Sequence, residues 1–312
     1  MDSKGIIDVV IPAFNAAPFI KDALSSVIVQ GQIVGKIIVV NDGSTDSTRQ
    51  IVENFSQNHP NFDWHLLNQK NSGLSNARNT GILFSTSEFI AFLDSDDIWL
   101  PNKLNAQYSV FINSQDKKLG VVYCGYFLIN SNKDILLEKY NVIYPKLKGY
   151  IYSKLLNGNF ISGSGSSVLI KRKCLDQVGN FDESLQACED WDLWLRISKV
   201  FHFDFIDKEY LLIRVHYANM QKNRLRMLTS ELMLLNKFVK NKEINFFLLW
   251  KIRTILVLLK INPDDIEGFN SCDPLLKKLF SNFRLKLIKI YLHSLSWFAL
   301  LYLNKIKQRD LS

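Results

Sequence analysis

The first hundred residues alternate between short apolar runs and longer amphipathic segments, and this alternation constrains the fold more than any other feature. The expected strands cover residues 6–11, 35–40, 62–67 and 88–93, and the expected helices between them cover residues 18–29, 45–57 and 74–84. The first run is almost continuously apolar, which suits a parallel strand covered on both faces. Four strands alternating with helices predict an α/β fold, with an open, mostly parallel sheet and helices on both faces.

Polar side chains follow three of these strands. Asn15 follows the first strand, Asp42 ends the second, and Asp94 and Asp96 follow the fourth. Ligands bind at the carboxyl ends of the strands in open parallel sheets, so we expect a ligand site at this edge. No G-x-G-x-x-G sequence follows the first strand, and the dinucleotide-binding fingerprint is therefore absent. Taken singly, Asp42 is better explained as an Asx-turn residue or a loop acid than as a ligand-binding residue.

The acidic stretch Asp94-Ser95-Asp96-Asp97 lies between a buried strand and a helix expected to begin near Pro101. In an extended segment Asp94 and Asp96 would point the same way, roughly 7 Å apart. One Mg²⁺ and a diphosphate could bridge that gap, because this ion takes one or two carboxylates together with phosphate oxygens. The alternative is a polar turn whose Asp caps the following helix.

Charge divides the chain of 312 residues into two parts. Residues 222–312 contain 17 Lys and Arg against 7 Asp and Glu, which leaves 21 against 23 in residues 1–221. We therefore expect an α/β domain over residues 1–221 and a basic, apolar helical region over residues 222–312, with helices near 225–260 and 275–308. The uncharged run 291–304 is too short to span a bilayer, which needs about 20 apolar residues. It could lie in the membrane interface or pack in a helical bundle.

The cysteines and the amino terminus indicate the cellular setting. Cys124, Cys174, Cys188 and Cys272 form no C-x-x-C pair and match no zinc or disulfide spacing, so reduced thiols are expected. The first apolar run is short, contains Asp8 and stops at Pro12, unlike a signal peptide. We expect a cytoplasmic protein, with peripheral contact to the anionic inner face of the membrane if the basic helices bind lipid.

Five short motifs together resemble those of family 2 glycosyltransferases. They are VVIPAFN at residues 9–15, VNDGSTD at 40–46, NSGLSNARNTG at 71–81, LDSDD at 93–97 and EDWDLWLR at 189–196. The resemblance implies the GT-A fold, which is a Rossmann-like sheet, and a nucleotide-diphosphate sugar as donor. Asn41 departs from the family pattern, which often has Asp before the position of Asp42.

The resemblance also implies roles for individual residues. The implied nucleotide-binding positions are Pro12, Ala13, Phe14, Asn15, Asp42, Arg78, Asp94 and Ser95. The ring of Phe14 would lie near the base, Asp42 would accept a hydrogen bond from uracil or thymine, and Arg78 would lie beside the base and phosphates. Core packing for Phe14 and a solvated helix charge for Arg78 are the alternatives.

A divalent cation, Mn²⁺ or Mg²⁺, is the cofactor that the resemblance implies. Asp96 would be the direct ligand, and Asp94 would approach the ribose and the metal's water shell. His216 follows an expected strand at 210–213 in an Arg-x-His sequence, and such residues lie near the diphosphate or metal in the family. A structural role for this histidine is equally open.

Glu189 and Asp190 lie in the first turn of an expected helix, where acids are favoured by the helix dipole whatever the function. Asp192 and Arg196 are spaced for an ion pair along the helix. By resemblance, Glu189 and Asp190 are the catalytic acids, with Asp190 as the base. Glycosyl transfer with inversion needs one carboxylate to take the proton of the attacking hydroxyl.

These observations predict an inverting glycosyltransferase. It would move a sugar from a nucleotide-diphosphate donor, with UDP- or dTDP-sugars favoured, to a hydroxyl of a glycan or lipid-linked acceptor, as in cell-surface polysaccharide synthesis. A metal-dependent nucleotidyltransferase would share the acid pair but would not need the helix at Glu189. A non-catalytic membrane-associated binding protein would not need a nucleotide pocket and a metal site together. Nucleic-acid binding is disfavoured, because the positive charge is mixed with apolar helix.

Overall fold

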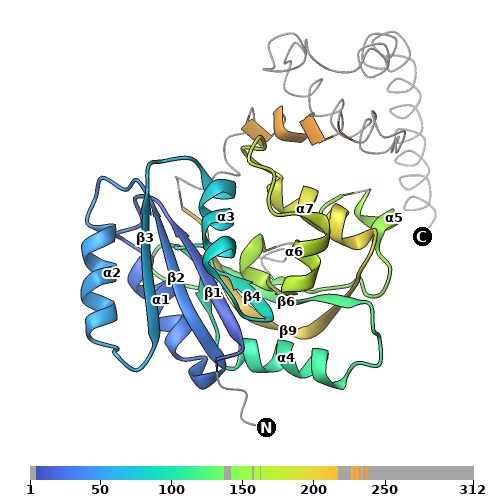
Figure 1. Cartoon of the computed structure of the whole chain (residues 1–312), viewed down its shortest axis with the longest axis horizontal. Coiled ribbons are helices and arrows are strands. Elements are labelled where there is room, and N and C mark those ends of the chain that lie inside the picture. Colours follow the sequence, from blue (N-terminus) through green and yellow to red (C-terminus); the bar gives the residue numbers. More distant parts are fainter. Residues whose placement is uncertain are drawn as a thin grey trace, which may run out of the picture. The chain divides into compact units, whose positions relative to one another are not determined.

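The computed structural model describes residues 5–136, 142–156, 158–161 and 163–216, with eight further residues between 226 and 237. Within these residues a single sheet of nine strands organises the fold (Figure 1). Its order is β3-β2-β1-β4-β8-β6-β9-β5, and β7 pairs with β6. Contacts between Cα atoms divide the chain into Met1–Ser230 and Glu231–Ser312, so the sheet belongs to the first unit.

The first half of the sheet is parallel. It is built from β1 (Ile7–Ala13), β2 (Val34–Asp42), β3 (Asp63–Gln69) and β4 (Phe89–Phe92), connected by α1 (Ile20–Ile28), the short turn η1 (Gly31–Ile33), α2 (Thr48–Gln57) and α3 (Leu74–Phe84). Strand β1 pairs in parallel with β2 and β4, and β2 with β3. The alternation predicted from the sequence is confirmed, with element ends shifted by at most three residues.

The second half of the sheet is mixed. Its elements are β5 (Ile98–Trp99), α4 (Lys103–Asn113), β6 (Leu119–Ile129), β7 (Val142–Ile143), α5 (Tyr152–Leu155), η2 (Gly165–Ser167), β8 (Val168–Lys171), α6 (Arg172–Val178), α7 (Glu189–Ser198) and β9 (His202–Arg214). Strand β8 is antiparallel to both β4 and β6, and β9 is parallel to β6. Strands β6 and β9 therefore run in the same direction as β1 to β4. The carboxyl end of β9 reaches the same edge as that of β4.

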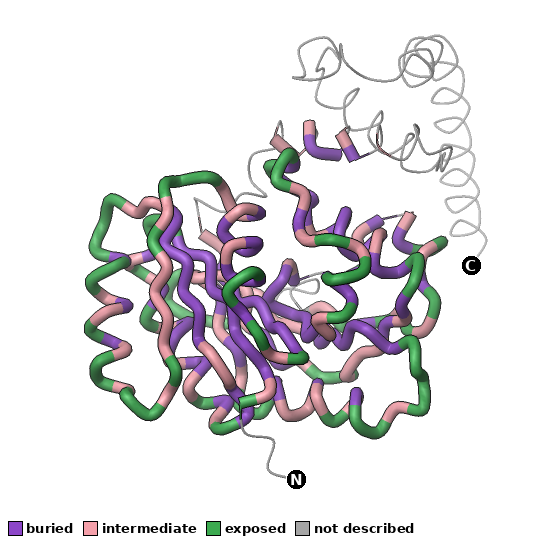
Figure 2. Tube along the Cα trace, in the orientation of Figure 1, coloured by how far each residue is buried: buried purple, intermediate pink, exposed green. Residues whose placement is uncertain are grey.

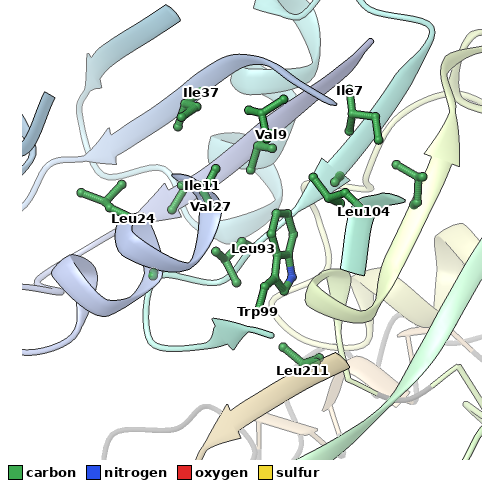
Figure 3. Packing of buried hydrophobic residues seen from close by; sticks show 14 of the residues in the cluster. Ile7, Val9, Ile11, Leu24, Val27, Ile37, Leu93, Trp99, Leu104 and Leu211 are labelled. Carbon is green, nitrogen blue, oxygen red and sulfur yellow. The ribbon is translucent and has the colours of Figure 1, made fainter. Parts of the chain in front are cut away.

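Alternation along β1 separates the two faces of the sheet. Ile7, Val9 and Ile11 point to one face, where they pack with Leu24 and Val27 of α1, Leu104 of α4, and Trp99 (Figure 3). These side chains are fully or almost fully buried, and each stabilises the fold by about 1.5–3 kcal/mol. The strands form the buried centre of the unit, and the exposed residues lie mainly on helices and loops (Figure 2).

Val10 points to the opposite face and packs under α3. A Cβ atom at Gly81 would collide with the Cγ1 and Cγ2 atoms of Val10, so this glycine lets the helix approach the sheet closely. The approach matters for the site, because Arg78 lies one turn earlier on α3 and is fully buried. Close packing at Gly81 thereby fixes the position from which the Arg78 side chain extends.

Several expectations concern residues beyond residue 216. The eight described residues between 226 and 237 are all helical. The remainder of the helices expected near 225–260 and 275–308 lies outside the described residues. In the part of the chain that the structure describes, no helix is long and apolar enough to cross a membrane.

Candidate active site

The first segment of the site is the end of β1. Phe14 is about half exposed, and Asn15 adopts a left-handed backbone conformation with φ 48°. Asn15 Oδ1 accepts the backbone N–H of Thr45 at 2.9 Å, and its own N–H donates to Ser44 Oγ at 3.0 Å. These bonds tie the end of β1 to the loop after β2. The Phe14 ring is left at the surface, at the edge of the sheet, and does not pack in the core.

Asp42, at the end of β2, organises the entrance to α3. Its Oδ1 accepts Gln69 Nε2 and the backbone N–H of Ser72, each at 2.8 Å, and its Oδ2 accepts the N–H of Gly73 at 2.9 Å. A carboxylate beside a helix amino terminus is also favoured by the helix dipole. A carboxylate offers about four acceptor positions, so Oδ2 retains room for one more donor. A base N–H remains the prediction for that position.

The acidic stretch after β4 forms a turn and not an extended segment, because the N–H of Asp97 donates to Asp94 O at 3.0 Å. The expectation that Asp94 and Asp96 point the same way along a strand is therefore wrong. The three acids of this turn differ in exposure. Asp97 is buried, whereas Asp94 and Asp96 are partly exposed, as is Ser95. The next helix, α4, begins at Lys103, two residues after Pro101 and directly after Asn102 in a left-handed conformation.

Asp97 anchors this turn to the protein interior. Its Oδ2 accepts the hydroxyl of Ser166 at 2.7 Å, and its Oδ1 accepts the N–H of Arg214 at 3.2 Å. Burial, together with the charges of Asp96 and Asp94, raises the pKa of Asp97 well above its usual value. The group is therefore a structural acid, and Asp94 and Asp96 are left as the candidates for ligand binding.

Asp96 and His216 meet at the edge of the sheet. His216 Nε2 lies 2.9 Å from Asp96 Oδ2, and the His216 ring packs on Phe19 with centroids 4.9 Å apart. Burial and the charge of Asp94 raise the pKa of Asp96, and the hydrogen bond from His216 opposes that shift. Across the described residues, no three His, Cys, Asp or Glu side chains are already arranged to hold a metal ion.

The donor atoms of this pair nevertheless fit the implied cation. A carboxylate oxygen and an imidazole nitrogen both suit Mn²⁺, and Mg²⁺ commonly binds one or two carboxylates and completes its shell with water and phosphate. Like-charged carboxylates in one turn are the arrangement that a cation stabilises, and the charge of Asp94 adds to burial in raising the pKa of Asp96. Asp96 and His216, with Asp94 nearby, are thus able to hold Mn²⁺ or Mg²⁺.

Arg214 holds the backbone of the acidic turn. Its side chain is buried, donates to Asp96 O at 3.0 Å and to Asp22 Oδ2 at 3.0 Å, and lies 4.8 Å from the centroid of the Phe19 ring. The two residues of the Arg-x-His sequence therefore have different tasks. Arg214 holds the backbone of the acidic turn, and His216 contacts its carboxylate.

Arg78 connects the acidic turn to α7. It is fully buried, and its Nη2 donates to Asp94 Oδ1 at 2.7 Å while its Nη1 donates to Glu189 Oε1 at 2.7 Å. The guanidinium also lies 5.1 Å from the centroid of the Phe181 ring. The alternative of a solvated helix charge is excluded, because these donors face protein carboxylates. Contact between Arg78 and a phosphate stays a prediction.

The Gly- and Ser-rich segment before β8 serves the acidic turn. Ser164 has a positive φ of 51°, and its hydroxyl accepts Arg78 Nη2 at 2.9 Å. Ser166 Oγ accepts the N–H of Asp94 at 3.0 Å and donates to Asp97. These hydroxyls fill the space between Arg78 and the turn.

The start of α7 presents two acids with different surroundings. Cys188 precedes them in a left-handed conformation with φ 60°, which turns the chain sharply into the helix. Glu189 is buried and paired with Arg78, so it is structural in this arrangement. Asp192 pairs with Arg196 at 2.7 Å, as the spacing predicted. Asp190 is the acid of this turn that is both partly exposed and not ion-paired with arginine.

Asp190 has the properties of a base poised near neutral pH. Its burial and the neighbouring Glu189 raise its pKa to about 7, whereas Arg78 and the hydrogen bonds from Trp191 N–H and Asn159 act in the opposite direction. A group with this pKa is half ionised at neutral pH, where it can both take and release a proton. Its position, pKa and partial exposure suit general-base chemistry.

Comparison with known proteins identifies the family. Residues 8–179, which are more than half of the chain, match the family described as Glycosyl transferase family 2. The chain belongs to this family.

A relative from Escherichia coli is named UDP-Glc:alpha-D-GlcNAc-diphosphoundecaprenol beta-1,3-glucosyltransferase WfgD. It is 30% identical over 241 residues, which cover 76% of this glycosyltransferase and 87% of the relative.

Two solved structures of glycosyltransferases share the fold. The S. aureus TarS fragment 1–349 in complex with UDP has a TM-score of 0.60 at 20% identity, covering 88% of this chain and 87% of that one. The mannosyltransferase PcManGT from Pyrobaculum calidifontis, in complex with GDP-Man and Mn²⁺, has a TM-score of 0.61 at 18% identity, covering 91% and 81%. The fold is GT-A, as predicted.

The structure of this family 2 glycosyltransferase brings most of the predicted residues to one edge of the sheet. Phe14, Asn15 and Asp42 border one part of that edge, whereas Pro12 and Ala13 are buried inside β1. Arg78 joins the Asp94 turn to the Glu189 end of α7. Their roles toward donor and acceptor stay predictions.

Other residues of the site were not predicted from the sequence. Asp22, Ser164, Ser166 and Asn159 contact Arg214, Arg78, Asp97 and Asp190 respectively. None of the four lies in a recognisable motif. One available signal was the Gly- and Ser-rich composition of residues 157–167, which marks a segment shaped by its backbone.

Proposed function

We propose that this enzyme transfers a sugar with inversion from a UDP- or dTDP-sugar to a hydroxyl of a glycan or lipid-linked acceptor, in the synthesis of a cell-surface polysaccharide. The observation that carries this proposal is the Arg78 bridge. One guanidinium joins Asp94, on the acidic turn, to Glu189, beside Asp190, with both distances 2.7 Å. The turn that suits a diphosphate and the candidate base therefore lie on opposite sides of a single side chain.

The preference for a uracil or thymine base rests on Asp42. The residue is almost fully buried, and three N–H donors already hold its carboxylate in place. The remaining acceptor position on Oδ2 suits an N–H group, which these pyrimidines carry at N3. The half-exposed Phe14 ring lies on the adjacent strand end, where it could stack on a planar base. The UDP-glucose in the name of the E. coli relative agrees with this preference.

The diphosphate side uses the acidic turn. Asp96 and His216 would hold Mn²⁺ or Mg²⁺, with Asp94 nearby, and the cation would supply charge neutralisation for the leaving diphosphate. Arg214 keeps the turn in place through Asp96 O, and Ser166 does so through Asp94 N–H. These contacts hold the turn before any ligand arrives, and such preorganisation is what electrostatic stabilisation of a leaving group requires.

The acceptor side uses Asp190. In an inverting displacement the acceptor hydroxyl approaches the face of the sugar opposite to the leaving diphosphate. Asp190 takes the hydroxyl proton as the oxygen bonds to the anomeric carbon, and the electron pair of the broken bond leaves with the diphosphate. Glu189 does not compete for this role, because it is buried and bound to Arg78.

The decisive experiment incubates the purified protein with a panel of sugar nucleotides and Mn²⁺ and measures diphosphate release and product. We expect release from a UDP- or dTDP-sugar and a product of opposite anomeric configuration by NMR. Asp190→Asn keeps the shape and should lower kcat by about 10²–10⁴, with little change in donor affinity. Asp116→Asn, a substitution of an acid near the start of β6, is the control and should retain activity.

Two results would contradict the proposal. A product with the configuration of the donor would mean a retaining mechanism. Near-normal turnover by Asp190→Asn would assign the base to another group. For the cation, Asp96→Asn should abolish stimulation by Mn²⁺ while the far-ultraviolet circular dichroism stays unchanged. Full stimulation in the folded variant would remove Asp96 from the metal site.

Membrane contact is proposed from the sequence alone, because residues 275–308 lie outside the described residues. Their basic ends and aromatic residues suit an interfacial helix. Sedimentation with vesicles containing anionic phosphatidylglycerol should show binding that weakens as salt rises, because Lys and Arg are screened. A variant ending at residue 274 should lose this binding. Equal sedimentation with neutral vesicles at high salt would refute an electrostatic contact.

A further inference from the structure

Asn159 approaches the candidate base from outside the family motifs. It lies in the segment 158–161 after α5, and its Nδ2 donates to Asp190 Oδ2 at 3.1 Å. The other end of the same amide, Oδ1, is buried and has no hydrogen-bond partner among the described residues. A buried carbonyl without a partner is unusual, because such groups are almost always paired in folded proteins. It therefore requires an explanation.

The two oxygens of Asp190 have different donors. Oδ1 accepts the N–H of Trp191 at 2.7 Å, a bond fixed by the backbone of α7. Among the described residues, Asn159 is the donor to Oδ2. Removing the amide would leave Oδ2 without this partner and would free the carboxyl to rotate about χ2. Asn159 thus controls both the orientation of the carboxyl and the charge that it can carry.

We propose that Asn159 is a positioning residue whose amide serves Asp190 in both of its protonation states during sugar transfer. The inference rests on the proposed function of Asp190 as the base. In the resting enzyme the Nδ2 donor holds the carboxylate. When the acceptor hydroxyl gives its proton to Oδ2, a new O–H replaces a lone pair. A half-turn of the Asn159 amide then brings Oδ1 to accept that O–H.

The unpartnered Oδ1 is explained by this exchange. A side chain with only donors could not accept the new O–H, and one with only acceptors would repel the carboxylate. An amide carries one of each on a planar group that can reverse its ends. After the product departs, the proton leaves Asp190 for solvent and the amide returns. No further reactant is needed, because the proton comes from the acceptor hydroxyl.

The charged surroundings of Asp190 set the background for this contact. Glu189 raises the pKa of Asp190, and Arg78, which reaches the site from α3, lowers it. On the elements packed against α7, Lys154 of α5 and Lys173 and Asp176 of α6 are exposed, and Arg172 of α6 donates to Ser87 O. On β9, Asp204 forms an ion pair with Lys148, and Arg214 holds the acidic turn. The other charged residues of this strand lie at the surface: Asp207 and Lys208 are exposed, and Glu209 is partly exposed.

Two variants of Asn159 separate its roles. Asn159→Leu keeps a similar volume without a donor or acceptor, and Asn159→Asp keeps the shape but replaces the donor by an oxygen. We expect the acid limb of the kcat–pH profile to move up by about one pH unit in the Leu variant, because a hydrogen bond to a charged group is lost. It should move further in the Asp variant. At pH 7 the Leu variant should then turn over about fivefold more slowly, with the KM for the donor unchanged.

The control is Asn113→Leu, since the Asn113 amide donates to Ser109 O at an exposed helix position far from the base in sequence. It should leave the profile unchanged. A second readout does not depend on turnover: the ¹³C resonance of the Asp190 carboxyl, assigned with Asp190→Asn, should titrate about one unit higher in Asn159→Leu than in the unaltered protein.

The outcomes are distinguishable. An unchanged titration and an unchanged acid limb in both Asn159 variants would overturn the inference. Failure of the unaltered protein to release diphosphate from any donor would instead overturn the proposed function, and the carboxyl titration would still report whether Asn159 acts on Asp190. A raised donor KM with an unmoved acid limb would assign Asn159 to donor binding and would also overturn it.

Discussion

Replacing Arg78 by methionine tests the central arrangement of the site. Methionine has a similar length and keeps contact with the Phe181 ring, but it removes the positive charge and every donor. Asp94 and Glu189 would each lose a partner at 2.7 Å, and the Ser164 hydroxyl would lose the hydrogen bond that it accepts from Arg78. Two carboxylates and no cation would then occupy the interior between α3, the acidic turn and α7.

The magnitude follows from burial. Arg78 is fully buried, the Glu189 side chain is 6% exposed and the Asp94 side chain is 21% exposed. Breaking a buried ion pair by removing one partner usually destabilises a protein by about 3–5 kcal/mol, because a charge is left uncompensated. Asp94 can rehydrate in part, and Glu189 can become protonated. We therefore expect the free energy of unfolding to fall by about 3 kcal/mol, the lower end of that range.

The assay is equilibrium unfolding in urea at pH 7, with the midpoint and slope compared between variants. The matched control is Arg49→Met, which removes an exposed i,i+4 pair with Glu53 at the same nitrogen–oxygen distance of 2.7 Å. That exposed pair should contribute less than about 0.5 kcal/mol. If Arg78→Met unfolds within about 1 kcal/mol of the unaltered protein, Arg78 is not the buried bridge that the site requires.

Three further predictions concern titration and support. The kcat of the unaltered enzyme should fall about tenfold per pH unit below pH 7, because Asp190, whose pKa is raised to about 7, must be ionised to act; a flat profile from pH 5 to 8 would exclude it as the base. Burial lowers the pKa of Lys103 to about 8. Its buried charge therefore destabilises the fold fully below pH 8, and this destabilisation is lost as the pH rises from 8 toward the ordinary pKa of lysine. Lys103→Met should therefore raise the free energy of unfolding by about 1 kcal/mol at pH 7, net of the contacts it loses, with the gain shrinking by pH 10; equal stability at both pH values would contradict this. Asp42→Asn should lower the free energy of unfolding by about 1–3 kcal/mol, because its amide cannot accept all three N–H groups, and urea unfolding would measure this loss.

The parallel half of the sheet could be predicted because its signals are local. Strands β1, β2 and β4 consist mainly of apolar residues, and each connecting helix follows its strand after a short connection. β5 and β7 could not be predicted, since a strand of two residues has no period of its own. The first half of β9 was missed for another reason. Asp204, Asp207 and Lys208 interrupt its apolar residues, and the strand persists because it pairs along the length of β6.

The site was predictable where family motifs marked it and not where long-range contacts shape it. The motif around Asp94 was recognisable, but its turn depends on the bond from Asp97 N–H and on Ser166, which lies 72 residues beyond Asp94. Arg78 lies on an ordinary amphipathic helix, and helical spacing alone predicts a solvated charge. Its burial follows from the approach of α7 and the segment before β8. These elements are far away in sequence and leave no trace in the local pattern.

The order of the strands explains why these distant segments meet. Strand β8 inserts between β4 and β6, so the segment before it arrives beside the acidic turn that follows β4. The chain then continues through α6 to α7, whose first residue reaches Arg78 across 111 positions of sequence. The Arg78–Asp94 contact spans only 16 positions of sequence. The other two partners of the guanidinium, Ser164 and Glu189, come from segments that follow the first half of the sheet. The donor side of the site is therefore complete only after β8 and α7 have docked. Since the same packing also positions Asp190, the two halves of the proposed chemistry depend on the same long-range contacts.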